Sequence, residues 1–154
     1  MKKIIALLCL TVLIIGCASV PTGITMKSGA VPYYDVNQAI TIKNIGVSED
    51  LKKWSVAIIS LLSTELEKRG AKITSDSPIV LKVGITKRSQ IPAGLLFCNI
   101  VTEVRTGDGY KKNFNVGTGS DVSLTFQKSC NSCVIKTVAA ILNNEKISDY
   151  IKSK

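Results

Sequence analysis

One long stretch of the chain has an apolar side and a polar side at helical spacing, and it restricts what the rest can form. It runs from about Glu49 to Arg69, with Ser48 placed to cap its start and Gly70 to end it. Its apolar residues recur every three or four positions: Leu51, Trp54, Ile58, Leu61, Leu62 and Leu66. Such a helix must bury one side, so a second layer of structure has to cover it.

Segments in which apolar and polar residues alternate, as in half-buried strands, predict that second layer. Strands are expected at about 39–47, 78–87, 95–106 and 110–116, a short extended piece at 71–73, a loop at 89–94 and a hairpin turn at 107–109. A second amphipathic helix is expected from about 121 to 143 and a short one over 145–151. The order β-α-β-β-β-α predicts an α+β two-layer sandwich, with two amphipathic helices on one face of a mostly antiparallel sheet.

The first residues of the chain differ from this body. Lys2 and Lys3 precede an apolar run from Ile4 to Ile15, and a small residue follows. This order is typical of a secretory signal peptide. The run is shorter than the about 20 apolar residues that a permanent membrane-spanning helix needs. We therefore expect residues 1–16 to be cleaved from the mature protein.

The end of this run, Leu13-Ile14-Ile15-Gly16-Cys17, resembles the lipobox of bacterial lipoproteins. The resemblance implies that Cys17 is acylated and becomes the first residue of the mature chain. An ordinary signal peptide and a signal anchor are the alternatives. In this family an aspartate after the cysteine often marks inner-membrane retention, and Ala18 here favours the outer membrane.

Three parts of the chain are therefore expected: the signal peptide 1–16, a lipidated N-terminus with a flexible tether over 17–38, and a single α+β domain over 39–154. The tether holds several proline, glycine and small polar residues without a sustained period. Its one apolar patch, Val31 to Tyr34, is expected to pack on the domain as an extended arm. A docking segment is the alternative for this patch.

The charge and the residue types exclude several classes of function. The chain has a formal net charge of +9 and no histidine, the commonest general base and metal ligand. We found no zinc-type cysteine pattern, phosphate-binding loop or nucleophile elbow, so we expect no enzyme, cofactor, metal or small-molecule substrate. The positive charge favours anionic lipids or lipopolysaccharide phosphates as partners, or serves solubility alone. The basic residues form no dense cluster, so nucleic acid is not expected.

Three cysteines remain after Cys9 leaves with the signal peptide and Cys17 is acylated. Disulfide bonds are plausible in an oxidising envelope compartment. The helix phase places Cys130 nearer the buried centre than Cys133, and Cys98 lies on the apolar face of its strand. We therefore predict a Cys98–Cys130 disulfide between sheet and helix. Three buried free thiols are the alternative.

Cys130-Asn131-Ser132-Cys133 is also a C-x-x-C motif, which in periplasmic proteins can belong to a thiol oxidoreductase. That function needs an activated cysteine at the start of a helix. Here the helical period begins upstream of Cys130, so the pair is expected inside the helix, and a structural role is favoured.

The small tethered domain also resembles, in architecture, the periplasm-facing lipoproteins of Gram-negative envelope assembly and the auxiliary lipoproteins of envelope ABC transporters. The resemblance implies an outer-membrane-anchored, non-catalytic binding or scaffold protein with an envelope protein partner and a membrane anchor at Cys17. The alternatives are an anionic lipid or lipopolysaccharide binder and, less favoured, a thiol-redox protein that uses Cys130 and Cys133.

Overall fold

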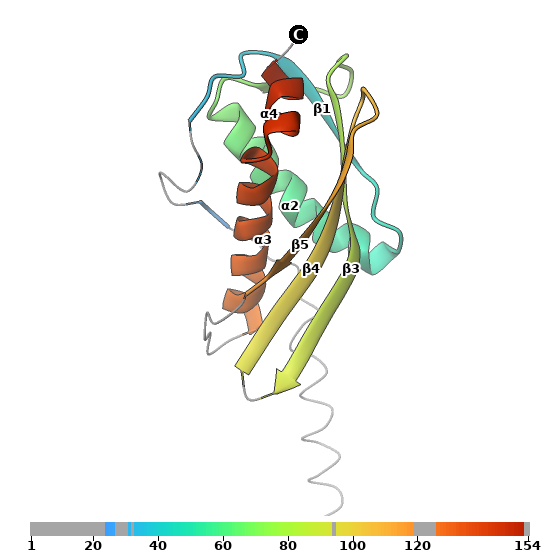
Figure 1. Cartoon of the computed structure of the whole chain (residues 1–154), viewed down its shortest axis with the longest axis vertical. Coiled ribbons are helices and arrows are strands. Elements are labelled where there is room, and N and C mark those ends of the chain that lie inside the picture. Colours follow the sequence, from blue (N-terminus) through green and yellow to red (C-terminus); the bar gives the residue numbers. More distant parts are fainter. Residues whose placement is uncertain (1–23, 27–30, 32, 94, 119–125, 153–154) are drawn as a thin grey trace, which may run out of the picture.

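The computed structural model describes residues 24–26, 31, 33–93, 95–118 and 126–152 of the 154-residue chain (Figure 1). Along the chain its elements are β1 (Ala39–Asn44), α2 (Glu49–Glu67), β2 (Lys72–Ile73), β3 (Val80–Ala93), β4 (Leu95–Thr106), β5 (Lys111–Gly117), α3 (Phe126–Leu142) and α4 (Glu145–Lys152). The short extended piece and the short last helix that the sequence predicts are both present.

The strands form one mixed sheet in the order β2-β1-β3-β4-β5. β1 lies parallel to both of its neighbours, β2 and β3. The helix α2 follows β1 and returns the chain to the same end of the sheet before β2 and β3 begin. The β3–β4 and β4–β5 ladders are antiparallel and are the longest in the sheet. The expected α+β fold is confirmed, and the parallel position of β1 is the feature that the sequence did not indicate.

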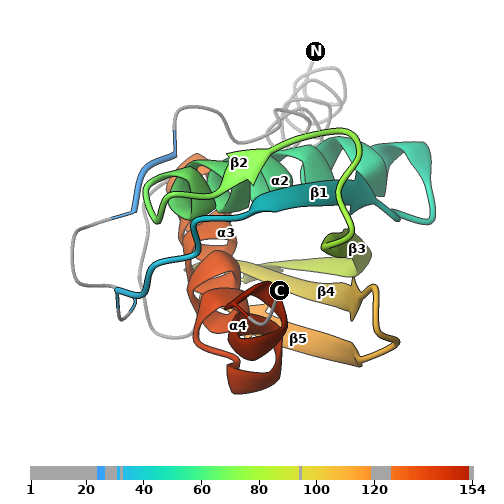
Figure 2. The same cartoon turned by 90° about the horizontal axis from the view of Figure 1, so that it is seen from above.

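The helices cover one face of this sheet. α2 contacts β1 and β3, while α3 contacts β4, β5 and α2. Figure 2 shows α2 running along β1, and α3 leading into α4 near the C-terminus. The alternate strand residues that meet the helices are fully buried: Ile40, Leu81, Val83, Ile85, Ile100 and Val104. The opposite face of the sheet therefore carries the polar half of each strand.

Local signals define α2 as expected. Ser48 caps its start by accepting a hydrogen bond from the Leu51 N–H at 3.3 Å, and Trp54 is buried in the core. The helix ends at Glu67, two residues before the expected end. Gly70 then turns the chain with a φ of +84°, and a Cβ there would lie 2.2 Å from Oδ1 of Asn37. Glycine is required at this position on both grounds.

The expected loop at 89–94 is wrong for residues 89–93, because β3 continues to Ala93 and pairs with β4 from Leu81 to Ala93, with one irregularity between Ile85 and Lys87. Residue 94 lies outside the described residues. Proline normally argues against a strand, and Pro92 lies in this extension opposite Leu96. β1 pairs with β3 only from Val80 to Val83, so among the described strands the remainder of β3 has no partner on that side. An edge strand tolerates a residue that has no N–H to donate.

Part of the segment that precedes β1 packs on the body. Val31 and Val36 are buried, and Ile24, Met26 and Tyr34 pack against the same core. The prediction that the apolar patch packs as an extended arm is therefore confirmed for Val31 and Tyr34, and we call residues 31 and 33–38 the arm. The division of the chain at residues 16 and 38 stays a prediction.

Candidate functional site

Cys17, the predicted lipid attachment site, lies outside the described residues, and its acylation stays a prediction. Within the described part of the chain no helix is long and apolar enough to cross a membrane. The same part holds no group of histidine, cysteine and acidic side chains that could bind a metal ion. The remaining candidates are the thiols, a buried ion pair beneath the arm, and the outer face of the sheet.

The three cysteines of the body come together between β4 and the first half of α3. All three are buried and none forms a disulfide in the structure, so it contains no Cys98–Cys130 disulfide, and the predicted pairing stays a prediction. The Cys133 thiol donates to the Cys98 carbonyl oxygen at 2.7 Å and approaches the Val116 carbonyl at 3.7 Å. This arrangement is the alternative that the sequence left open.

The expected burial order of the helix cysteines is wrong. Cys133 is 0% exposed and Cys130 3% exposed, so Cys133 is the better buried of the two. The helix-phase estimate assumed one buried direction for α3. In the structure α3 contacts α2 as well as β4 and β5, so more of its circumference is buried than a single direction would allow. Cys133 lies on this additional buried part, against β4.

The cluster is poorly suited to thiol chemistry. A hydrogen bond with Cys130 lowers the pKa of Cys98, but the hydrogen bond with Cys133, burial and the electrostatic interaction with Cys133 raise it to about 12. Cys98 is therefore a neutral thiol at physiological pH, whereas nucleophilic cysteines are thiolates. Cys130 and Cys133 lie beyond the first turn of α3, as expected, and neither is accessible. The cluster acts as apolar filling.

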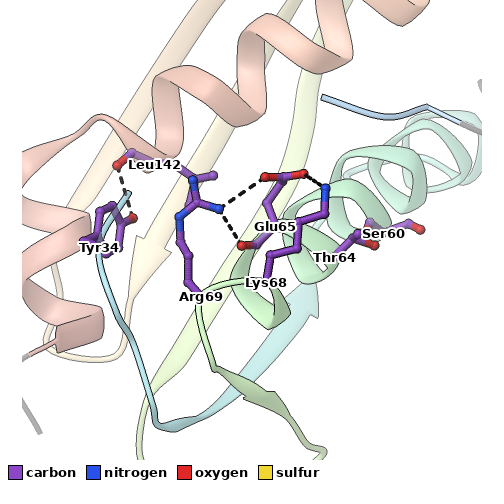
Figure 3. A network of polar contacts seen from close by, with 7 residues as sticks. All are labelled: Tyr34, Ser60, Thr64, Glu65, Lys68, Arg69 and Leu142. Atoms are coloured by element: carbon purple, nitrogen blue, oxygen red, sulfur yellow. Dashed lines mark hydrogen bonds and ion pairs between the residues drawn. The ribbon is translucent and has the colours of Figure 1, made fainter. Parts of the chain in front are cut away.

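A buried ion pair lies beneath the arm at the end of α2 (Figure 3). Glu65 accepts a hydrogen bond from Arg69 at 3.2 Å and one from Lys68 at 2.6 Å. Arg69 also donates to the Glu65 carbonyl at 2.6 Å, and its side chain is almost fully buried. Burying a charge is costly unless it is paired, and here both charges are paired.

The arm is held against this ion pair by several contacts. The Tyr34 hydroxyl donates to the Leu142 carbonyl at 3.2 Å, and the Arg69 guanidinium lies 5.5 Å from the Tyr34 ring centre (Figure 3). The Val36 N–H donates to the Arg69 carbonyl at 2.8 Å. Burial raises the pKa of Tyr34, and the Arg69 charge lowers it less than burial raises it. We call Tyr34, Glu65, Lys68 and Arg69 the arm clamp.

The outer face of the sheet carries a row of positive charge. The strand register places Lys43 of β1 opposite Lys82 of β3, Lys82 opposite Arg105 of β4, and Arg105 opposite Lys111 of β5. All four side chains are exposed. Partners in register point to the same side of a sheet, so these four form one continuous line across four strands. We call them the basic row.

One carboxylate accompanies the basic row. Glu103 forms ion pairs with Arg105 at 2.5 Å and with Lys111 at 2.6 Å. Burial raises the pKa of Glu103, but the hydrogen bonds and charges of Lys111 and Arg105 outweigh it and lower that pKa. The carboxylate is therefore ionised at neutral pH. Sequence alternation placed these side chains on polar strand faces, but only the register brings them into one line.

Comparison with known proteins adds evidence on the fold. No family model matches the chain, and no curated protein matches it. Among solved structures it is similar to a Xanthomonas campestris protein assigned to the DUF330 family model. The TM-score is 0.52 and the identity 13%, over 80% of this chain and 93% of that one.

A second solved structure is a minor lipoprotein from Acinetobacter baumannii. Its TM-score is 0.49 and its identity 11%, over 70% of this chain and 91% of that one. The Xanthomonas likeness concerns the fold, at an identity too low to transfer an activity. The chain is thus a small α+β protein of a fold that already has a solved example in a bacterial protein of the DUF330 family model.

Proposed function

We propose that this protein is a lipoprotein of the bacterial envelope, anchored through Cys17 in the outer membrane and facing the periplasm. There it acts as a non-catalytic binding or scaffold component of envelope assembly or transport. The sequence that precedes Cys17 supports the anchor. The absence of histidine and the buried, neutral Cys98 thiol support a role without catalysis.

The packing of residues close to the predicted anchor carries this proposal. Ile24 and Met26 already lie against the core, only a few residues after Cys17. Seven residue steps from Cys17 to Ile24 span at most about 25 Å when fully extended. A chain acylated at Cys17 is therefore held close to its membrane, because the packing of Ile24 and Met26 leaves only the residues before Ile24 to span the distance.

The exposed residue Tyr33 is the best-placed contact for a protein partner. Its side chain is 70% exposed, while its neighbours Val31 and Tyr34 are fixed on the body. Tyrosine is enriched among the residues that contribute most to protein interfaces. The arm thus presents an aromatic side chain from a rigid position near the membrane.

Mass spectrometry of the full chain isolated from envelope fractions tests the anchor. We expect cleavage before Cys17, acyl chains on Cys17, and sedimentation with the outer membrane. The Cys17→Ser variant should lose the acyl chains and leave that fraction. A wild-type chain that retains residues 1–16, or has a free Cys17, would contradict the anchor.

Photo-crosslinking in intact cells tests the scaffold role. A photoreactive residue in place of Tyr33 should give one discrete adduct with an envelope protein. The same residue in place of Val56, which is exposed on α2, is the matched control and should give none. If the acylated protein gives no adduct at Tyr33, or equal adducts at both positions, the docking role of the arm is wrong.

A further inference from the structure

The basic row is not explained by the stability of the fold. Like charges placed directly opposite each other across strands destabilise a sheet. Glu103 compensates Arg105 and Lys111, but in the described part of the chain neither Lys43 nor Lys82 takes part in an ion pair. The register nevertheless places these two lysines side by side. An arrangement that costs stability in the free protein points to a ligand that supplies the missing negative charge.

A fifth cation extends the same surface. Lys87 of β3 lies in register with Val101 and Asn115 on the outer face and is exposed. We call the basic row together with Lys87 the basic face. Among the described strand residues, Glu103 is the one carboxylate on this face. Excess positive charge is therefore spread over four strands.

We propose that the basic face lies on the anionic phospholipid headgroups of a bilayer surface. This inference rests on the proposed anchor, which holds the body within reach of such a surface, and names what the body contacts there. Charge complementarity selects the occupant, since each lysine or arginine near an anionic membrane adds to the attraction.

The shape of the site favours a membrane surface over a single small anion. Four strands set about 4.8 Å apart spread the basic row over about 14 Å. The row lies on the outside of a sheet, where its side chains are exposed instead of converging on one point. Many separate phosphates match this spacing, whereas a single phosphate contacts one or two of the side chains.

Energy transfer between the protein and the lipid tests the inference. The full chain is reconstituted in phosphatidylcholine vesicles with or without phosphatidylglycerol. A donor dye is attached through Asn115→Cys on the outer face, and the acceptor is a headgroup-labelled lipid. The chain without this substitution reports background labelling. Transfer should be greater with phosphatidylglycerol, and the gain should vanish at about 1 M salt, where the screening length is about 3 Å.

Paired charge removal identifies the surface responsible. The double variant Lys43→Gln, Lys82→Gln should shift the equilibrium about 25-fold toward the undocked state, which is about fivefold for each positive charge removed. The matched control is Lys53→Gln with Lys112→Gln. Lys53 lies on α2, and Lys112 is in register with core-facing Val104, on the opposite side of β5 from Lys111. This control should leave the transfer unchanged.

The possible results separate this inference from the anchor. Equal transfer in both vesicles, or an equal loss in both double variants, overturns the inference. Transfer that does not depend on phosphatidylglycerol, together with a dye response to added DNA, also overturns it and assigns the face to nucleic acid. Mass spectrometry of the same sample reports acylation of Cys17, so an unacylated chain overturns the anchor while the dye still decides the inference.

Discussion

Two glutamates of this protein have the same burial and the same kind of partners, yet they lie in opposite settings. Glu65 and Glu103 are each 6% exposed, and each pairs with two basic side chains. Beneath the arm, Arg69 is itself buried and is also bonded to backbone. On the outer face, the side chains of Arg105 and Lys111 are 50% and 53% exposed.

The two sites differ in one cation: Arg69 is buried, whereas Arg105 and Lys111 are about half-exposed, as Lys68 is. We infer that a buried cation marks a structural ion pair, and that a group of exposed cations leaves charge for a ligand. Within the fold, the Arg69 guanidinium pairs with Glu65 and lies over the Tyr34 ring. Arg105 and Lys111 keep contact with solvent, and Arg105 lies in register with Lys82 of the basic row. The arm clamp should therefore govern stability, and the basic face should govern interaction with anions.

The largest effect is expected from Arg69→Met. Breaking a buried ion pair by removing one partner costs about 3–5 kcal/mol, and a value near 3 kcal/mol is expected because Lys68 still pairs with Glu65. Urea unfolding measures the loss. Arg105→Met, the equivalent change beside Glu103, should cost below about 1 kcal/mol, because Arg105 is half-exposed and Lys111 still pairs with Glu103. Equal losses in the two variants would remove the distinction between the sites.

A second variant tests the contribution of Tyr34, the residue of the arm clamp that belongs to the arm. Tyr34→Phe keeps the ring over Arg69 but removes the hydrogen bond to the Leu142 carbonyl, which should cost about 0.5–1.5 kcal/mol. Thermal or urea unfolding gives the value. Tyr33→Phe, at an exposed position beside it, should leave stability unchanged. If Tyr33→Phe has the larger effect, the arm is held differently.

The smallest effect is expected from the pH dependence of Glu103→Gln. The folded-state pKa of Glu103 is lowered, so its carboxylate contributes stability above its unfolded pKa of about 4.3, and that contribution is lost as the pH falls through the folded value. The stability difference between wild type and variant should be below about 1 kcal/mol at neutral pH and should vanish in acid. Urea unfolding of wild type and Glu103→Gln, at neutral pH and at an acid pH below the folded-state pKa, measures this difference. A difference that grows in acid would contradict the assigned pairing.

Much of the fold could be predicted because its signals are local. The apolar stripe, the Ser48 cap and the Gly70 turn define α2 within one stretch of sequence. The expected loop at 89–94 is wrong for residues 89–93, because a proline such as Pro92 normally argues against a strand. The strand there is acceptable only because β1 stops pairing at Val83, and the sequence around Pro92 does not contain that information.

The candidate sites were harder to predict from the sequence than the fold was. The C-x-x-C motif was correctly placed inside a helix, but the burial order of Cys130 and Cys133 depends on which elements pack around α3. The basic face was missed for a similar reason. Its residues are scattered from Lys43 to Lys111, and no sequence window holds more than a few of them.

The sequence by itself predicted an N-terminal targeting pattern, which stays a prediction, and determined the amphipathic helices and the polar and apolar sides of most strand residues. These depend on residue type and spacing within about 20 positions. Only the tertiary structure decided the parallel place of β1, the packing of the arm on Arg69, and the alignment of Lys43, Lys82, Arg105 and Lys111. Strand order and register join residues far apart in the chain, so a row of charge exists only after the sheet has formed.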